Sequence, residues 1–473
     1  MNRTMAVLVA LATVFIAGCA TPVPQVLNAS MVPKKFTGPS APTAPPWPDA
    51  NWWQGYRDPQ LANLVAEAQA NNLDLTAAAA RVLQAEAQSG IQRAALFPQL
   101  TGQAAHSNSA CSGAACLQQY EAAKTTSVNF NATYQIDVWG LAHDNLHAAQ
   151  EQLKSARFAR QSVALTVTVE AANQYFTVLA IRRRLAIAHE DLEAINGILE
   201  IITLRAKAGA ISRLDLAQEQ AQLESVEAQL PGLETAEREA LFTLAQLLGR
   251  PPEGFEIDGH DLDHIAQPEV SEGLPSDLLL RRPDVAQAEA NLAAAHANVD
   301  AARAAFLPQL SLTGSSGFVS TAIGALLRGS NFGFSYGAGL LQTLFDGGRL
   351  YGQRALAIGV QKELVADYQS ATLNAFVDVE DALIEVANTH KAHDHLVREV
   401  DAAREAFGIG QLQYRQGATE LLTVLQAQQT LFLAEDELAQ MQLANCQAVV
   451  HLYEALGGGW VESAKDRTQF VSN

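Results

Sequence analysis

The fold is decided by residues Gly273–Gly314, which read GLPSDLLLRRPDVAQAEANLAAAHANVDAARAAFLPQLSLTG. Part of this stretch occurs twice, because Arg303–Leu310 reads RAAFLPQL and Arg93–Leu100 reads RAALFPQL. The copies lie about 210 residues apart, which is too far for a solenoid unit and suits a duplicated half of a protein. Other pairs keep nearly the same offset: Asp74 and Asp284, Gly140 and Gly348, Gly209 and Gly417, Gly249 and Gly457. The chain is therefore internally duplicated.

Each half is expected to run as helix, strand pair, long helix, turn and helix. Pro98 and Pro308 mark the change from helix to strand, because proline cannot continue a helix and pushes the preceding residue toward extended backbone. Five residues after Pro308 repeat at every second position on one face: Leu310, Leu312, Gly314, Ser316 and Phe318. The repeated motif thus predicts a helix that is followed directly by a strand.

The clearest predicted strand is Thr125–Val138, in which apolar and polar side chains alternate. Residues 332–340 repeat this pattern in the second half, with aromatic residues alternating with Gly and Ser. An apolar face opposite a polar face is what a barrel strand between lipid and water requires, although a half-buried strand of a soluble sheet has the same pattern. A polar loop is expected to join each strand pair.

A helix of about 35 residues is predicted before Pro98, and a long helix is predicted after Gly140 and again after Gly348. Each long helix would run about 65 residues, or about 100 Å. Gly209 and Gly417 follow, where the end of a helix favours a residue of left-handed conformation. Returning helices are expected over about 212–248 and 418–456, the second with a coiled-coil seam from Leu431.

Four membrane-type strands per chain cannot close a barrel, which needs about eight or more. Because lipid leaves open strand edges without hydrogen-bond partners, the chain must oligomerise. Two copies would give a barrel filled by side chains, and three would leave a passage.

Composition excludes several classes of function. The 473 residues are 48% hydrophobic and carry a net charge of −19, which argues against nucleic acid, whose phosphates require clustered Lys and Arg. The acidity fits a soluble surface, or an interior that prefers cations.

The first 18 residues are expected to be a signal peptide, with Arg3 followed by a short apolar run. Ile16-Ala17-Gly18-Cys19 resembles a bacterial lipobox, so lipidation of Cys19 is expected, the alternative being ordinary cleavage. Export makes a disulfide between Cys111 and Cys116 plausible, and Cys446 is expected to be a small buried residue.

Several motifs together resemble the TolC-like outer-membrane efflux family. They are the duplicated stretch, the WW and DPQLANLV segments, LFDGGR at 344–349, YRQGATELLTVLQAQQ at 414–429 and LYEALGGGW at 452–460. The lipobox is similar to that of the NodT-type lipoprotein branch. The resemblance covers nearly the whole chain after Cys19.

The resemblance implies an α+β membrane protein. A long-helix α-barrel would be joined to a transmembrane β-barrel completed by trimerisation, with four strands per chain and an equatorial mixed domain. The expected divisions are a signal peptide (1–18), an extended N-terminal equatorial segment (19–60), a first structural repeat (61–250), an equatorial linker (251–283), a second repeat (284–456) and an equatorial tail (457–473).

The implied function is the outer-membrane exit duct of a tripartite efflux pump, lipid-anchored with a long periplasmic extension. Its implied partners are two further copies, a periplasmic adaptor (membrane fusion) protein, an inner-membrane transporter of the resistance-nodulation-division type, and outer-membrane lipid. No cofactor or metal is implied, and no nucleic acid.

The family places its gate at the periplasmic end of the helices. An apolar ring is expected at Leu422, and Gln426 stands where the family carries an aspartate one turn later. Glu420 could supply charge instead, and Leu214 with Asp215 is the equivalent candidate from the first half. These residues could also merely face neighbouring helices. Adaptor contacts are expected at the exposed turns, with the candidate residues Arg205, Gly209, Tyr414, Arg415 and Gly417.

Three alternatives remain open. An enzyme is disfavoured, because the chain has no phosphate-binding loop, nucleophile elbow or HExxH motif. The histidines at 143, 147, 390 and 393 and the segment Asp258–His264 have metal-ligand spacing, but a solvated helix face or loop explains them better. A coiled-coil lipoprotein without a pore, and an exit duct for type I protein secretion, are the other two.

Overall fold

The computed structural model describes residues 31–33, 35–37, 47–109, 123–207, 212–268, 275–278 and 281–460. The chain divides into two compact units. Unit 1 comprises Met1–Leu27, Arg81–Ala156 and Gln287–Gln369, and unit 2 comprises Asn28–Ala80, Arg157–Ala286 and Ser370–Asn473. Each unit therefore takes residues from both halves of the duplicated sequence.

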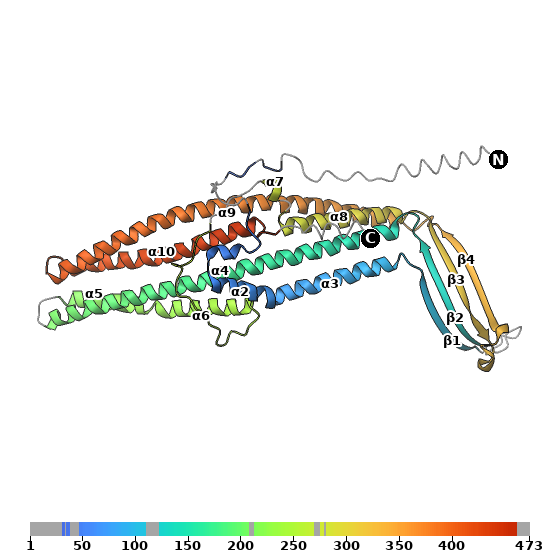
Figure 1. Cartoon of the computed structure of the whole chain (residues 1–473), viewed down its shortest axis with the longest axis horizontal. Coiled ribbons are helices and arrows are strands. Elements are labelled where there is room, and N and C mark those ends of the chain that lie inside the picture. Colours follow the sequence, from blue (N-terminus) through green and yellow to red (C-terminus); the bar gives the residue numbers. More distant parts are fainter. Residues whose placement is uncertain are drawn as a thin grey trace. The chain divides into compact units, whose positions relative to one another are not determined.

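Unit 1 contains one antiparallel sheet in the order β1-β2-β3-β4 (Figure 1). The strands are β1 (Gln99–Ser109), β2 (Ala123–Ile136), β3 (Gln309–Ser320) and β4 (Phe332–Leu341). The loop between β3 and β4 holds two short turns of 3-10 helix, η3 (Ile323–Ala325) and η4 (Gly329–Asn331). The two strand pairs predicted from the duplication are confirmed, and they join through β2 and β3.

One face of the sheet is apolar across all four strands. Leu100 pairs with Ala132, which pairs with Gly314, which pairs with Tyr336. Two positions away in either direction, the face continues with Phe130, Tyr134, Leu312, Phe334 and Ala338, together with Gly102 and Ser316. The alternate positions are mostly polar: Thr101, Asn131, Thr133, Thr313, Ser315 and Ser335. The predicted faces of β2, β3 and β4 are thus confirmed.

Each strand pair begins where a helix meets a proline. Helices α3 (Leu73–Ala94) and α8 (Pro283–Ala304) end four residues before Pro98 and Pro308, and the strands follow directly. The predicted change from helix to strand along the chain is therefore confirmed in both halves.

After each strand pair, an aspartate accepts a hydrogen bond from the first turn of a long helix. Asp137 accepts a hydrogen bond from the backbone N–H of His143 in α4 (Leu141–Lys207) at 2.9 Å. Asp346 accepts one from Leu350 in α9 (Arg349–Arg415) at 3.0 Å. Because Asp137 caps the helix, β2 ends at Ile136, two residues before the predicted end. Both long helices have 67 residues, close to expectation.

Unit 2 packs helices around a large apolar cluster. Besides its parts of the long helices it holds α2 (Pro59–Asn71), α5 (Arg213–Glu227), α6 (Leu230–Leu247), α10 (Leu421–Ala455), the one-turn α7 (Pro275–Leu278) and the 3-10 helix η1 (Trp52–Tyr56). In Figure 1, α5 and α6 lie along α4, and α10 lies along α9. Trp52 stacks on Tyr453 with ring centroids 4.8 Å apart, and the Tyr56 hydroxyl donates to the Cys446 carbonyl at 3.0 Å.

Two expected helices are broken. The helix before Pro98 divides at Asn72, whose backbone is extended and whose side-chain oxygen accepts from Asp74 and Leu75 at 2.9 and 3.0 Å. The first returning helix divides after Glu227, because Pro231 lacks the N–H that would bond the Glu227 carbonyl and its ring would clash with that group. The second returning helix is continuous, as predicted.

The returning helices end in the same way in both halves. Gly249 and Gly457 have positive φ angles of 68° and 84°. An added Cβ would stand 2.6 Å from the Asn71 carbonyl oxygen at the first position and 2.0 Å from the Arg281 carbonyl oxygen at the second. Both glycines are therefore required by backbone conformation and by close approach of another segment.

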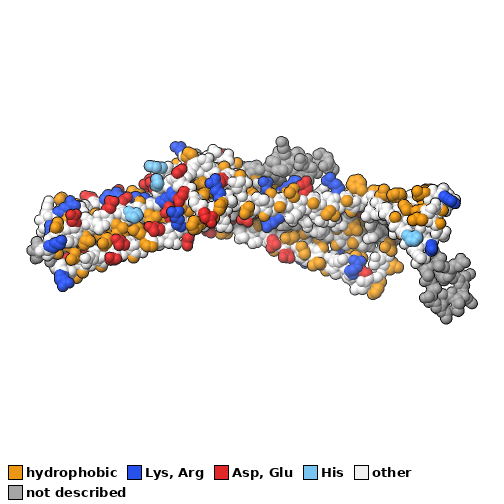
Figure 2. All heavy atoms as spheres, turned by 90° about the horizontal axis from the view of Figure 1, so that it is seen from below, with side chains coloured by type: hydrophobic (Ala, Val, Ile, Leu, Met, Phe, Trp, Pro, Cys, Tyr) orange, Lys and Arg blue, Asp and Glu red, His pale blue; other side chains and the backbone are white. Residues whose placement is uncertain are grey.

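The surface differs between helices and sheet. On the face drawn in Figure 2, hydrophobic side chains gather over the strands, and most of the acidic side chains lie over the helices. Among the helices of the described residues, none combines the length and apolar character needed to cross a lipid bilayer.

We expect Gly457→Ala to lower the apparent melting temperature in detergent more than Gly417→Ala does. Both glycines have positive φ angles, so each alanine costs about 1–2 kcal/mol of backbone strain. Only the Cβ at 457 meets another segment, since nothing lies within 4 Å of the one at 417. Circular dichroism on the purified variants measures the difference, and equal melting temperatures would contradict the role given to the close approach.

Candidate functional site

The candidate site is the end of unit 2 where α4 turns into α5 and α9 turns into α10. We call α4–α5 the first hairpin and α9–α10 the second hairpin, and we call residues 198–207, 212–219 and 407–426 the tip. Gly209, a predicted adaptor contact, lies outside the described residues, as do Cys19, Cys111 and Cys116.

The turn of the second hairpin is built as predicted. Gly417 has a φ angle of 75°, and the N–H of Ala418 bonds the Gln413 carbonyl at 2.8 Å. The N–H of Gly417 also bonds the Tyr414 carbonyl at 3.0 Å, which completes a Schellman motif. Arg415 and Gly417 are exposed on this turn.

Arg205 of α4 joins the two hairpins. Its guanidinium carbon lies 4.9 Å from the centroid of the Tyr414 ring, and Nη2 donates to the Arg415 carbonyl at 3.2 Å. The expectation that Tyr414 is exposed is wrong, because its side chain is only 6% exposed. It packs in an apolar cluster with the tip residues Ile198, Ile202, Leu421 and Val424. In the single chain Arg205 and Tyr414 therefore hold the tip together.

The predicted gate residues lie on exposed surface. Leu422 is 49% exposed and Gln426 is exposed one turn later on the same face of α10. Leu214 occupies the corresponding position in the first hairpin and is 65% exposed. Glu420 precedes α10 as its N-cap residue but makes no side-chain capping bond. Two leucines of the duplicated halves are thus left uncovered at the tip.

Asp215 has a local structural role. Its Oδ2 accepts from the Ser212 N–H at 3.1 Å, while the Ser212 hydroxyl oxygen accepts from the Leu214 N–H at 2.8 Å. This capping box starts α5. Asp215 therefore stabilises the helix start in addition to any part in a gate.

Three buried polar residues between the hairpins were not predicted from the sequence. Glu219 of α5 is fully buried, Gln428 of α10 is 2% exposed and Asp191 of α4 is 9% exposed. The Gln428 amide donates to Asp191 Oδ1 at 2.8 Å. Burial, and secondarily the charge of Asp191, raises the pKa of Glu219 to about 7. Their signal in the sequence was a polar residue at a position that the helical repeat assigns to the core.

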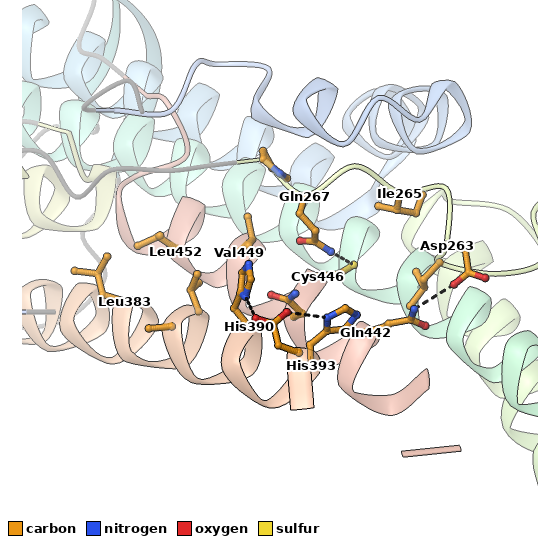
Figure 3. Close-up of a pocket in the computed structure, with 16 residues that line it drawn as sticks. Asp263, Ile265, Gln267, Leu383, His390, His393, Gln442, Cys446, Val449 and Leu452 are labelled. Carbon is orange, nitrogen blue, oxygen red and sulfur yellow. Dashed lines mark hydrogen bonds and ion pairs between the residues drawn. The ribbon is translucent and has the colours of Figure 1, made fainter. Parts of the chain in front are cut away.

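A cavity of about 660 Å³ lies elsewhere in unit 2, between α9, α10 and the segment 262–268 (Figure 3). Its wall includes the buried Cys446 thiol, which accepts from the Gln267 amide at 3.0 Å, and burial raises the pKa of this thiol to about 12. His390 and His393 lie 3.6 and 3.9 Å from Asp394. No group of three or more His, Cys, Asp or Glu side chains within the described ranges could hold a metal ion.

The sequence profile of the family described as "Outer membrane efflux protein" matches residues 64–250 and 274–458, which are the two halves of the duplication. The chain belongs to this family. Among its relatives, the "Pyoverdine export outer membrane protein OpmQ" of Pseudomonas aeruginosa is 38% identical over 86% of this chain and 87% of the relative. The "Probable outer membrane lipoprotein SilC" of Salmonella typhimurium is 28% identical over 96% and 99%.

Among solved structures, the outer-membrane channel OprN has a TM-score of 0.86 at 25% identity, covering 93% of this chain and 99% of that one. The TolC-like resemblance and the α+β channel fold are thereby confirmed. As a member of the outer membrane efflux protein family, the protein is an outer-membrane efflux channel, and the family consists of channel proteins rather than enzymes.

We expect Arg205→Ala to loosen the tip, because it removes a cation–π contact of about 1 kcal/mol and the hydrogen bond to the Arg415 carbonyl. Hydrogen exchange should accelerate by about fivefold or more in the last turns of α4 and α9. Arg213→Ala, which removes the same charge from an exposed position of the tip, is the control. Equal exchange in the two variants would show that Arg205 does not join the hairpins.

Proposed function

We propose that three copies of this chain form the exit duct of a tripartite efflux pump. The duct crosses the outer membrane through a β-barrel, continues as a tube of helices and opens at the tip. Small molecules that an inner-membrane transporter delivers leave through it.

The observation that carries the proposal is the sheet. Its mostly apolar face extends across all four strands, as lipid contact requires, and its opposite face is mostly polar, as a water-filled passage requires. Within the described residues, β1 and β4 each pair along one edge only. Because lipid cannot satisfy the free edges, β1 of one copy is expected to pair with β4 of the next. Three copies contribute twelve strands, which suffice to enclose water.

The exposed leucines at the tip support a gate. Leu214 and Leu422 of each copy would face the axis of the helical tube, where six leucines form an apolar constriction. In this arrangement the Arg205–Tyr414 contact holds the two hairpins of each copy in the closed position. Gln426 replaces an acidic residue, so the constriction of this protein is less negative than the family pattern.

The partners follow from the same arrangement. The turn at Arg415 and Gly417 is exposed and rigid, which suits contact with a periplasmic adaptor of the membrane fusion class. We propose an inner-membrane transporter of the resistance-nodulation-division type as the third component. Efflux of small organic molecules, rather than of proteins, is supported by the relative OpmQ, whose name assigns it to pyoverdine export.

The anchoring and the waist of the duct are also proposals. Cys19 is proposed to carry the lipid, and SilC, which is named a lipoprotein, supports this. A disulfide between Cys111 and Cys116 is proposed for the loop that joins β1 and β2. The segments 19–60, 251–283 and 457–473 are proposed to form the equatorial domain. Arg182 supports the linker's place in it, since it donates to the carbonyls of Ile257 and Gly259 at 2.8 and 2.6 Å.

The proposal is tested by native mass spectrometry and single-channel recording on the purified lipoprotein. A trimer that conducts in planar bilayers is the expected result. A monomer, or a trimer without conductance even after the tip is loosened by Arg205→Ala, would contradict the duct.

We expect Leu422→Ser to increase the closed-state conductance, because serine replaces an apolar side chain in the constriction and lets water enter. An increase of about fivefold or more corresponds to roughly 1 kcal/mol in the closed–open equilibrium. Leu433→Ser, on the same helix at a similarly exposed leucine, is the matched control. If both variants leak equally, or neither does, Leu422 is not part of the gate.

A further inference from the structure

A polar layer interrupts the apolar core between the two hairpins. In α4, Asp191 stands between the buried residues Ile187 and Ile195. In α10, Gln428 stands between Val424 and Phe432, which are also buried. In α5, Glu219 stands between Leu216 and Leu223, both of which pack on the apolar clusters. Each polar residue is three or four positions from its apolar neighbours, so each occupies a core position of its helix.

On α5 and α10 the layer lies between two apolar clusters, whereas on α4 Asp191 lies within the second of them. The tip cluster holds Tyr414, Leu421 and Val424, and the next cluster along the hairpins holds Ile195, Val226 and Phe432. Glu219 lies six residues from the start of α5, which is about 9 Å. The layer therefore lies at the border between the tip and the rest of the hairpins, where a movement of the tip relative to the hairpins would begin.

Four of the five side-chain oxygen atoms of this layer lack a hydrogen-bond partner. Neither carboxyl oxygen of Glu219 has a hydrogen bond, and Oδ2 of Asp191 and Oε1 of Gln428 have none either. A buried ionised carboxylate without a partner is costly, since it has lost water and gained nothing in return. This arrangement therefore favours the neutral form of Glu219.

Within the part of the chain that the structure describes, no cation forms an ion pair with Glu219. Asp191 of α4 faces Glu219, and the charge of Asp191 is the second cause, after burial, of the raised pKa of Glu219. No other described group is a cause of this shift. The pKa of Asp191 is itself raised, by burial first and by Glu435 on α10, while the Gln428 hydrogen bond opposes this. The other titratable or charged groups on the helices around Glu219 are Asp215 on α5, Tyr414 on α9, Arg205 beside Tyr414, and Arg404, which pairs with Glu435 at 2.7 Å.

We propose that Asp191, Glu219 and Gln428 form a proton-sensitive layer that closes the tip while Glu219 is protonated and loosens it when Glu219 ionises. This inference rests on the proposed gating function and adds its regulation. Ionisation places a second negative charge beside Asp191 in the core, and separation of α5 from α4 and α10 relieves it by admitting water.

The direction of the pH effect follows from the raised pKa of Glu219. The stability that the neutral carboxyl contributes is fully present below its ordinary pKa of 4.5 and is lost as the pH rises through about 7. Over this range the ratio of closed to open tip should fall by up to about tenfold per pH unit and then level off. The tip should thus be tightest in acid.

The test compares wild type, Glu219→Gln and Glu224→Gln in planar bilayers between pH 5 and pH 8. Glutamine keeps the shape of the side chain but does not titrate, and Glu224 is an exposed carboxylate of the same helix. The wild type and Glu224→Gln should show closed-state leak that rises with pH, and Glu219→Gln should remain flat. Asp191→Asn should move the rise to lower pH, because it removes the charge that helps to keep Glu219 protonated. A Glu219→Gln profile equal to that of the wild type would overturn the proposal.

Hydrogen exchange in α5 provides a readout that does not depend on conduction. At each pH, amides of residues 213–227 should exchange faster in the wild type than in Glu219→Gln, with the difference appearing above pH 5. If none of the proteins conducts at any pH, the duct fails, and this exchange difference still decides the proton-sensitive layer. Equal exchange in both proteins across the range would refute it.

Discussion

Every peptide group in a lipid bilayer needs a hydrogen-bond partner from protein, and the four-stranded sheet cannot meet this demand alone. Eleven residue pairs join β1 to β2, and eleven join β2 to β3. Within the described residues, the outer edges of β1 and β4 have no partner strand. In the proposed duct, the cost of unpaired groups would make association with further copies a condition of membrane insertion. The proposed gate and adaptor contacts depend on that association.

The duplicated halves solve the same structural problems with partly different residues. At the end of α6 the Asn72 amide donates to the Leu247 carbonyl, and at the end of α10 the Arg282 guanidinium donates to the Ala455 carbonyl. These carbonyls are the orphan groups of a helix C-terminus, so each half must supply some donor. Arg282 also forms ion pairs with Asp284 and Asp378, so the second half adds charge where the first uses an amide.

The elements and their order could be predicted because they depend on local rules. Pro98 and Pro308 end helices by removing a donor, Gly417 ends one by adopting a positive φ angle, and alternation along β2 marks its lipid and water faces. The prediction of an unbroken first returning helix was wrong because it neglected the local effect of Pro231, whereas two other wrong expectations concern single side chains with competing choices. Asn72 could continue a helix or cap the next one, and Tyr414 could face solvent or pack under Arg205. Which choice wins depends on neighbours that are far away in the sequence.

By itself, the sequence determined the duplication, the succession of helices and strands, the apolar faces of β2, β3 and β4 and the family to which the chain belongs. These properties reside in spacing and in the conformational limits of proline and glycine, which act within a few residues. Only the tertiary structure decided that Arg205 packs on the ring of Tyr414 and that Asp191, Glu219 and Gln428 lie in one buried layer. A carboxyl group becomes unusual through what surrounds it, and residues of α4, α5 and α10 become neighbours only when the hairpins pack.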